Sequence, residues 1–169
     1  GVLAGDYYGA WAADIDMDGD LDYIVAPLSG SPIVLRNNGD GTFKVVKDLF
    51  PGVADVRDFA WADFNHDGAP DPAFLDAHGK LTVFFNQRRG QFTASPLPDA
   101  AAAGGLALAA ADVNDDGILD LLVFGKDGVV RRVSTEGEGN WTAPVEVARW
   151  GNFRAGPFGP GEFRLLAQD

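Results

Sequence analysis

The 169-residue sequence contains no cysteine and no long apolar run. Without cysteine the protein can form neither disulfides nor thiolate metal sites. No apolar stretch approaches the roughly 18 residues of a transmembrane helix, so we expect no membrane insertion. The N-terminus also lacks a charged-then-apolar leader, and we expect a signal peptide to be absent or already removed. Because the chain starts at Gly1 rather than Met, we expect it to be a piece of a larger protein.

Basic residues are scarce: 13 Lys and Arg stand against 25 Asp and Glu, for a net charge of −12. This balance excludes binding to nucleic acid or an anionic membrane surface, which needs basic patches, and it favours cations. The hydrophobic fraction of 46% is enough for a globular domain with a core. With 22 Gly, 10 Pro and only short apolar runs, the composition predicts many strands joined by tight turns.

Five carboxylates fall within the nine residues 14–22, and the cluster recurs at 63–71 and 112–120, each time after 49 residues. Further positions keep the same interval. They are the turn glycines Gly30, Gly79 and Gly128, the glycines Gly41, Gly90 and Gly139, and the aromatics Phe43, Phe92 and Trp141. A fixed period of 40 to 50 residues is typical of propellers and solenoids.

Each unit contains apolar runs that are too short for helices and are bounded by turn residues, such as 23–26 and 81–85. The Ala-rich segment 100–111 resembles a helix, but its register and Gly104-Gly105 favour a strand. We therefore predict an all-β fold in which each unit is a propeller blade of about four antiparallel strands. One segment, 1–169, would hold repeats at about 6–54, 55–103 and 104–152 and a degenerate partial repeat at 153–169.

The acidic loops share the pattern Asp-x-Asp/Asn-x-Asp-Gly-x-x-Asp. Positions 1, 3, 5 and 9 offer side-chain oxygens, position 7 offers a backbone carbonyl, and Gly at position 6 permits a sharp turn. An all-oxygen set suits Ca²⁺ better than Mg²⁺, which demands strict octahedral geometry, or Zn²⁺, which prefers His and Cys. The alternative, a solvated acidic turn, is disfavoured by three copies in register. An EF-hand is excluded because its Glu at position 12 is replaced by Val25, Phe74 and Val123.

These loops, the apolar strand after each, and Val25-Ala26-Pro27 resemble the FG-GAP/VCBS repeats of integrin-α-like propellers and of ASPIC/UnbV-type bacterial proteins. The resemblance covers about 5–152 and implies one Ca²⁺ in the loop between the first two strands of each blade, about three ions in all. The implied side-chain ligands are Asp14, Asp16, Asp18, Asp22, Asp63, Asn65, Asp67, Asp71, Asp112, Asn114, Asp116 and Asp120. The implied carbonyl ligands are those of Asp20, Ala69 and Ile118.

Propellers of that family usually close with about seven blades, whereas three units and a remnant are present here. Open ends leave sheet faces and edges exposed. We therefore expect flanking blades, a second copy or another protein subunit to cover them, in a homo-oligomer or a larger assembly.

Other candidate residues have simpler interpretations. His66 and His78 are expected at the surface, Trp11, Trp61 and Trp141 in the core, and the pairs Arg88-Arg89 and Arg131-Arg132 in solvated hairpins. Asn140-Trp141-Thr142 matches a glycosylation sequon. Trp150 is the best candidate for contact with a ligand. No residues are placed for a catalytic triad, and the carboxylates that could serve a glycosidase are those assigned to the metal.

The sequence therefore predicts a non-catalytic, calcium-binding β-propeller scaffold or interaction module of a larger exported protein, located outside the cell, in the periplasm or at the cell surface. Millimolar extracellular Ca²⁺ suits weak sites of this kind. Two alternatives stay open: a carbohydrate-binding propeller that uses exposed aromatics and binds a glycan, and an accessory or catalytic domain of an extracellular enzyme.

Overall fold

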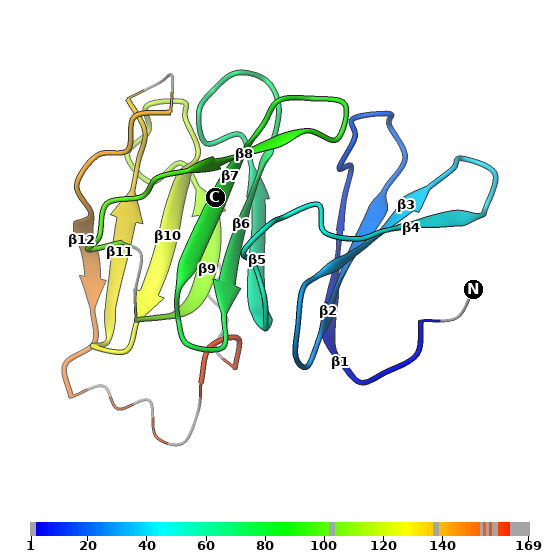
Figure 1. Cartoon of the computed structure of the whole chain (residues 1–169). Helices are drawn as coiled ribbons and strands as arrows, with labels where there is room; N and C mark the ends of the chain where they lie inside the picture. Colours follow the sequence, from blue (N-terminus) through cyan, green and yellow to red (C-terminus); the bar gives the residue numbers. More distant parts are fainter. Residues whose placement is uncertain are drawn as a thin grey trace.

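The computed structural model describes residues 3–101, 104–136, 139–152, 154, 156 and 159–162, in which all regular structure is strand (Figure 1). Blade 1 contains β1 (Tyr7–Ala13), β2 (Asp22–Pro27), β3 (Ile33–Asn37) and β4 (Phe43–Val46). Blade 2 contains β5 (Val56–Ala62), β6 (Asp71–Asp76), β7 (Leu81–Asn86) and β8 (Phe92–Ser95). Blade 3 contains β9 (Gly105–Ala111), β10 (Asp120–Gly125), β11 (Val129–Val133) and β12 (Val145–Arg149). The prediction of an all-β fold with four strands per repeat is confirmed.

Within each blade the strands pair antiparallel in chain order, so every connection is a reversal to the neighbouring strand. The Ala-rich segment is strand β9, as expected, and it pairs with β10 from Ala111 opposite Asp120 to Gly105 opposite Gly125. β6 and β10 are buried almost throughout, on both faces of their sheets. This explains why they read as continuous apolar runs without polar alternation.

The three sheets stand side by side with their faces together (Figure 1), and the two interfaces differ in chemistry. Between blades 1 and 2 the buried cluster contains four phenylalanines among aliphatic side chains, and the ring of Phe50 lies 4.8 Å from Phe74 and 5.0 Å from Phe92. Between blades 2 and 3 it consists mainly of Ala, Leu and Val. Both clusters use equivalent strand positions, so the repeat sets the geometry while residue volume differs from one interface to the next.

Two of the turn glycines that mark the repeat, Gly30 and Gly79, also link successive blades. Their carbonyl oxygens accept hydrogen bonds of 2.9 Å from the amide of Asp55, directly before β5, and from the amide of Gly105, the first residue of β9. The Gly128 carbonyl accepts a bond of the same length from the amide of Trp150, directly after β12 of its own blade. At Gly79 (φ 82°) a Cβ atom would lie 2.6 Å from the carbonyl oxygen of Gly105. Glycine is required there because the two chains approach within backbone contact.

The outer face of blade 1 is apolar and partly exposed. The register places Ala12, Tyr23, Leu35 and Val45 in one row across the four strands, with Phe43 two residues before Val45. Tyr23 and Phe43 are each 44% exposed, and their rings lie 5.7 Å apart. The equivalent face of blade 2 is covered by blade 1, and that of blade 3 is covered by blade 2. Blade 1 therefore presents the type of surface that the other two blades bury.

Most of the predicted partial fourth repeat, 153–169, lies outside the described residues. The described residues after β12 form no strand. The turn at 159–162 instead lies against β9, where the Gly161 amide donates a 2.9 Å hydrogen bond to the Leu106 carbonyl. The described part of the chain contains no helix long and apolar enough to span a membrane.

Phe92 and Phe43 occupy equivalent positions, so the same substitution tests the difference between a covered and an open face. Phe92→Ala should lower the free energy of unfolding by about 1–3 kcal/mol, because the ring packs on Phe50 and Trp61. Phe43→Ala should lower the free energy of unfolding by less than about 1 kcal/mol, because it removes a single cross-strand pair. Urea denaturation of both variants measures the difference, and equal losses would contradict an open outer face on blade 1.

Candidate metal centre

Three acidic loops lie at the same end of the sheets, each joining the first and second strands of its blade (Figure 1). We call them loop 1 (14–22), loop 2 (63–71) and loop 3 (112–120). In each, the first aspartate follows the end of the first strand and the ninth residue begins the second strand. Strand pairing thus holds both ends of the loop, and the carboxylates between them are confined to a short arc.

The first aspartate closes its loop with both carboxylate oxygens. In loop 2, Asp63 Oδ1 accepts the amide of Asp67 at 3.1 Å and Oδ2 accepts that of Gly68 at 2.8 Å. Asp14 and Asp112 make the same two bonds in loops 1 and 3. The fifth residue then accepts the amide of the seventh, as Asp67 does from Ala69 at 2.9 Å. The three loops therefore share one internal hydrogen-bond pattern.

The loop turns through two left-handed residues. Gly at position 6 has φ of 95°, 81° and 84° in the three loops, as predicted from its place in the pattern. Position 4 is also left-handed, with φ of 61° at Met17 and 59° at both His66 and Asp115. A side chain is strained in this region, and the same strain in all three loops indicates that the surrounding hydrogen bonds impose the conformation.

The ninth aspartate is the most buried polar group of each loop: Asp22 and Asp71 are 0% exposed and Asp120 is 1% exposed. Asp71 Oδ2 accepts the Phe64 amide within the loop, and Oδ1 accepts the Asn86 amide at the end of β7. Asp22 makes the equivalent bonds to Ile15 and Asn37. This carboxylate thus ties the loop to the third strand of its blade, whatever its role as a ligand.

Burial raises the pKa of Asp71 to about 7, although hydrogen bonds from the Asn86 and Phe64 amides act to lower it. The charges of Asp67 and Asp63 raise it further. Burial also raises the pKa of Asp16, while the nearby Arg36 guanidinium acts to lower it. In both cases burial disfavours the charged form of the carboxyl group. A cation beside the carboxylates would favour the charged form.

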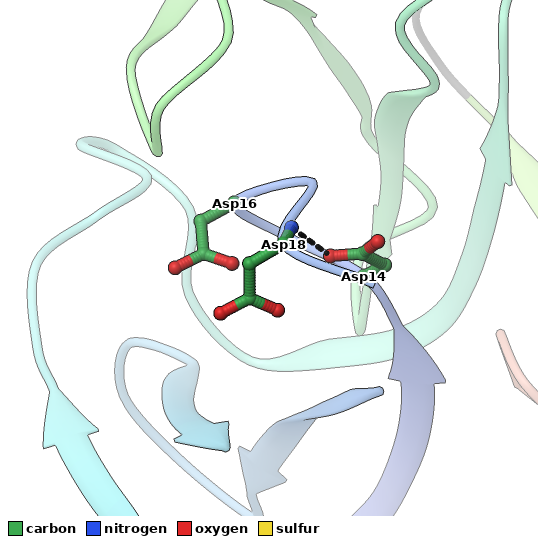
Figure 2. Close-up of side chains that lie close together, drawn as sticks. All are labelled: Asp14, Asp16 and Asp18. Carbon is green, nitrogen blue, oxygen red and sulfur yellow. Dashed lines mark hydrogen bonds between the residues drawn. The ribbon is translucent and has the colours of Figure 1, made fainter. Parts of the chain in front are cut away.

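In loop 1 the structure gathers three predicted ligands: carboxylate oxygens of Asp14, Asp16 and Asp18 lie within 4.8 Å of one another (Figure 2). One oxygen of Asp16, Oδ1, is buried and has no hydrogen-bond partner. In loops 2 and 3 the third residue is an amide that donates to the fifth: Asn65 to Asp67 at 3.2 Å and Asn114 to Asp116 at 2.7 Å.

These residues fit a hard divalent cation. The donor set is all oxygen, the first, third and fifth side chains converge, and the buried Asp16 Oδ1 lacks a partner that an ion would supply. The ninth carboxylates and the carbonyls of Asp20, Ala69 and Ile118 stay predicted ligands.

Several residues of the site were not predicted. Asn86 braces loop 2, because its amide bonds to Asp71 and its Nδ2 donates 3.0 Å to the Pro70 carbonyl. Asn37 does the same in blade 1. The signal was in the sequence, since these asparagines stand 49 residues apart. Arg36 and Arg88 also reach loops 1 and 2: Arg88 donates 2.6 Å to the Asp67 carbonyl, so it is more than a solvated hairpin residue.

The histidines and tryptophans lie largely where expected, whereas Arg131 and Arg132, predicted in a solvated hairpin, are half-buried residues of β11. His66 and His78 are exposed. Trp141 stacks on Phe85 and donates from Nε1 to Ser95 Oγ at 2.8 Å, which joins blade 3 to blade 2. Trp11 and Trp61 border the aromatic interface. Trp150 is 53% exposed, with its ring 5.4 Å from that of Phe124.

Comparison with known families gives an independent result. A family model described as "FG-GAP-like repeat" matches residues 14–74 and 73–123, which together span all three acidic loops. Comparison with curated proteins gave no match.

Asp71→Ala should destabilise the metal-free protein by about 2–4 kcal/mol, because it leaves the buried Phe64 and Asn86 amides without acceptors. Denaturation in EDTA measures this structural contribution separately from any metal. Asp99→Ala, which removes the same charge at an exposed position, should change stability by less than about 0.5 kcal/mol. A similar small effect at Asp71 would contradict the bracing role.

Proposed function

Because this chain belongs to the family of proteins with FG-GAP-like repeats, we propose that it is a calcium-stabilised β-propeller scaffold and interaction module of a larger exported protein. Domains built from such repeats are in general structural or interaction modules. The proposal adds calcium as the stabilising ion, a non-catalytic role and a location outside the cytoplasm.

The observation that carries the proposal is the internal closure of the three loops. In each loop the first, fifth and ninth carboxylates accept hydrogen bonds from backbone amides of the same blade or, at Asp120, also from a hydroxyl group. The acidic side chains are therefore held together rather than spread into solvent. Two unit charges about 4 Å apart repel by about 4 kcal/mol at an effective dielectric constant of about 20. A divalent cation at the centre of each loop removes that repulsion.

Bound calcium would act on folding. The unfolded chain has no preformed site, so ion binding adds to the free energy of unfolding. At a free concentration one hundred times Kd, each site contributes about 2.7 kcal/mol. The loops join strands that pack against neighbouring blades. Ion binding would therefore also stabilise the interfaces between the blades. Residues that could serve acid–base chemistry are the same carboxylates, which supports a non-catalytic role.

The apolar outer face of blade 1 supports the interaction part of the proposal. Its equivalents on blades 2 and 3 are covered by the sheet of the preceding blade. A further blade of the same repeat type, presenting a face of small and aliphatic side chains, is the partner that matches Tyr23 and Phe43. Repeats of this family occur mostly in extracellular proteins, and millimolar calcium there suits sites of moderate affinity.

Calcium removal tests the proposal directly. The melting temperature measured by calorimetry should fall by several degrees in EDTA and recover when excess Ca²⁺ is restored. Mg²⁺ should restore less, because the loops offer more oxygens than its octahedral shell accepts. Identical melting curves in EDTA and in Ca²⁺ would overturn the proposed role of the ion. An ionic-strength control with NaCl separates specific binding from general charge screening.

A second candidate function, carbohydrate binding, rests on the half-exposed indole of Trp150. Aromatic faces pack on sugar rings, and Trp is a common anchor at binding surfaces. Screening the chain on a glycan array, followed by Trp150→Ala for any ligand found, tests this candidate. Loss of binding in the variant with an unchanged melting temperature would support it, and an array without ligands would count against it.

A further inference from the structure

Loop 1 is contacted by an arginine whose register-equivalent residues in the other two blades are uncharged, although Arg88, from a different position, lies 3.9 Å from Asp67 Oδ1 in loop 2. Arg36, on β3, places Nε 2.6 Å from Asp16 Oδ2, and its terminal nitrogen lies 3.9 Å from Asp18 Oδ2. The register-equivalent residues are Phe85 in blade 2 and Ser134 in blade 3, neither of which carries charge. Arg36 thus contacts two of the three carboxylates that converge in Figure 2.

The other position that distinguishes loop 1 is its third residue. Asp16 replaces the asparagine of loops 2 and 3, so loop 1 has one more carboxylate among its side-chain ligand positions. Asn65 and Asn114 turn their amide groups toward the fifth aspartate. Asp16 has no such donor and instead pairs through one oxygen with Arg36, leaving Oδ1 buried without a partner. The arginine therefore offsets the additional negative charge.

A cavity of about 230 Å³ adjoins this pair, between blade 1 and the β7–β8 hairpin. Asp16, Arg36, Lys44 and Arg89 contribute to its lining. The side chain of Arg36 is 45% exposed. The guanidinium is therefore held by its ion pair rather than by packing on all sides, and it has space to leave the carboxylate.

We propose that Arg36 is a resident counter-ion of loop 1: it stabilises the loop without metal and competes with Ca²⁺ for Asp16 and Asp18. This rests on the calcium-binding function proposed above and deepens it by making the three sites unequal. Binding at loop 1 requires the guanidinium to give up Asp16 Oδ2 and move toward the cavity. With Arg36 in place, loop 1 has the lowest calcium affinity of the three loops. Without it, the additional carboxylate makes loop 1 the tightest.

Arg36→Met tests the inference, since methionine retains an unbranched apolar stem and loses the charge. In calcium titrations by isothermal calorimetry, one site of the variant should bind about tenfold more tightly than in the wild type, as expected for removing a unit charge some 5–6 Å from a divalent ion in largely aqueous surroundings. Lys44→Met is the matched control, because it removes a positive charge from the lining of the same cavity. Among the described residues, Lys44 forms no ion pair with loop 1. Its effect should be at most about threefold.

The second readout is stability, where a purely structural salt bridge behaves differently. Arg36→Met should lower the melting temperature in EDTA, because loop 1 loses its counter-ion, and should not lower it in saturating Ca²⁺, because the ion replaces the guanidinium. Equal losses in both conditions would overturn the inference. The Asp16→Asn variant assigns the altered site to loop 1. In that variant, the change in the logarithm of calcium affinity caused by Arg36→Met should be less than half the change seen in the wild type, because the partner of Arg36 is already absent.

These outcomes separate the two proposals. A wild-type protein that binds no calcium contradicts the proposed function. If the wild-type protein binds calcium and Arg36→Met leaves its affinities unchanged or weakens them, only the proposed counter-ion role of Arg36 is contradicted.

Discussion

The structure depends on a buried carboxylate at the point where each acidic loop enters its second strand. Asp71 is fully buried, yet both of its oxygens accept backbone amides, one from the loop and one from the third strand of the blade. Burying a carboxylate is unfavourable unless hydrogen bonds or a counter-charge offset the loss of water. The amides supply part of this offset, and the raised pKa of Asp71 indicates that they do not supply all of it. Loop closure and strand pairing are therefore linked through one side chain per blade, and a cation bound as proposed would supply the rest of the offset at Asp71.

The repeat fixes where blades touch, but it leaves the chemistry of each contact free to differ. Equivalent faces hold aromatic rings between blades 1 and 2 and mainly Ala, Leu and Val between blades 2 and 3. Aromatic side chains bury large areas in specific geometries, so the first interface tolerates less change than its position alone suggests. Backbone hydrogen bonds at Gly30 and Gly79 link each of the first two blades to the next one. A conserved backbone frame with variable side-chain filling is how a repeat array can specify the order of its own blades.

The 49-residue interval was sufficient to predict the fold class, the four strands of each blade and the strand at the Ala-rich segment. It also placed the acidic loops and their sharp glycine turns correctly. The left-handed conformation of Met17 could not be predicted, because methionine rarely adopts it, whereas His66 and Asp115 at the same loop position are of residue types enriched there. The contact of Arg36 with Asp16 was missed for a different reason. It joins a loop to a strand 20 residues later, and only the observed register of β2 and β3 brings the two together.

Charge is distributed unequally over loops that share one hydrogen-bond pattern. Loop 1 has four aspartates at its side-chain ligand positions and an arginine on two of them, whereas loop 2 has three, with Arg88 bonded mainly to a backbone carbonyl. Guanidinium groups so close to the carboxylates reduce repulsion when no cation is present, but each also opposes the entry of one. A protein that must remain folded while calcium varies benefits from the first effect, and a protein that must respond to calcium requires the second to be limited. Among the described residues, the closest pair of a guanidinium with a carboxylate of these loops is Arg36 with Asp16. Under the proposed calcium binding, loop 1 is therefore the loop in which stability without the ion and affinity for the ion are most strongly opposed.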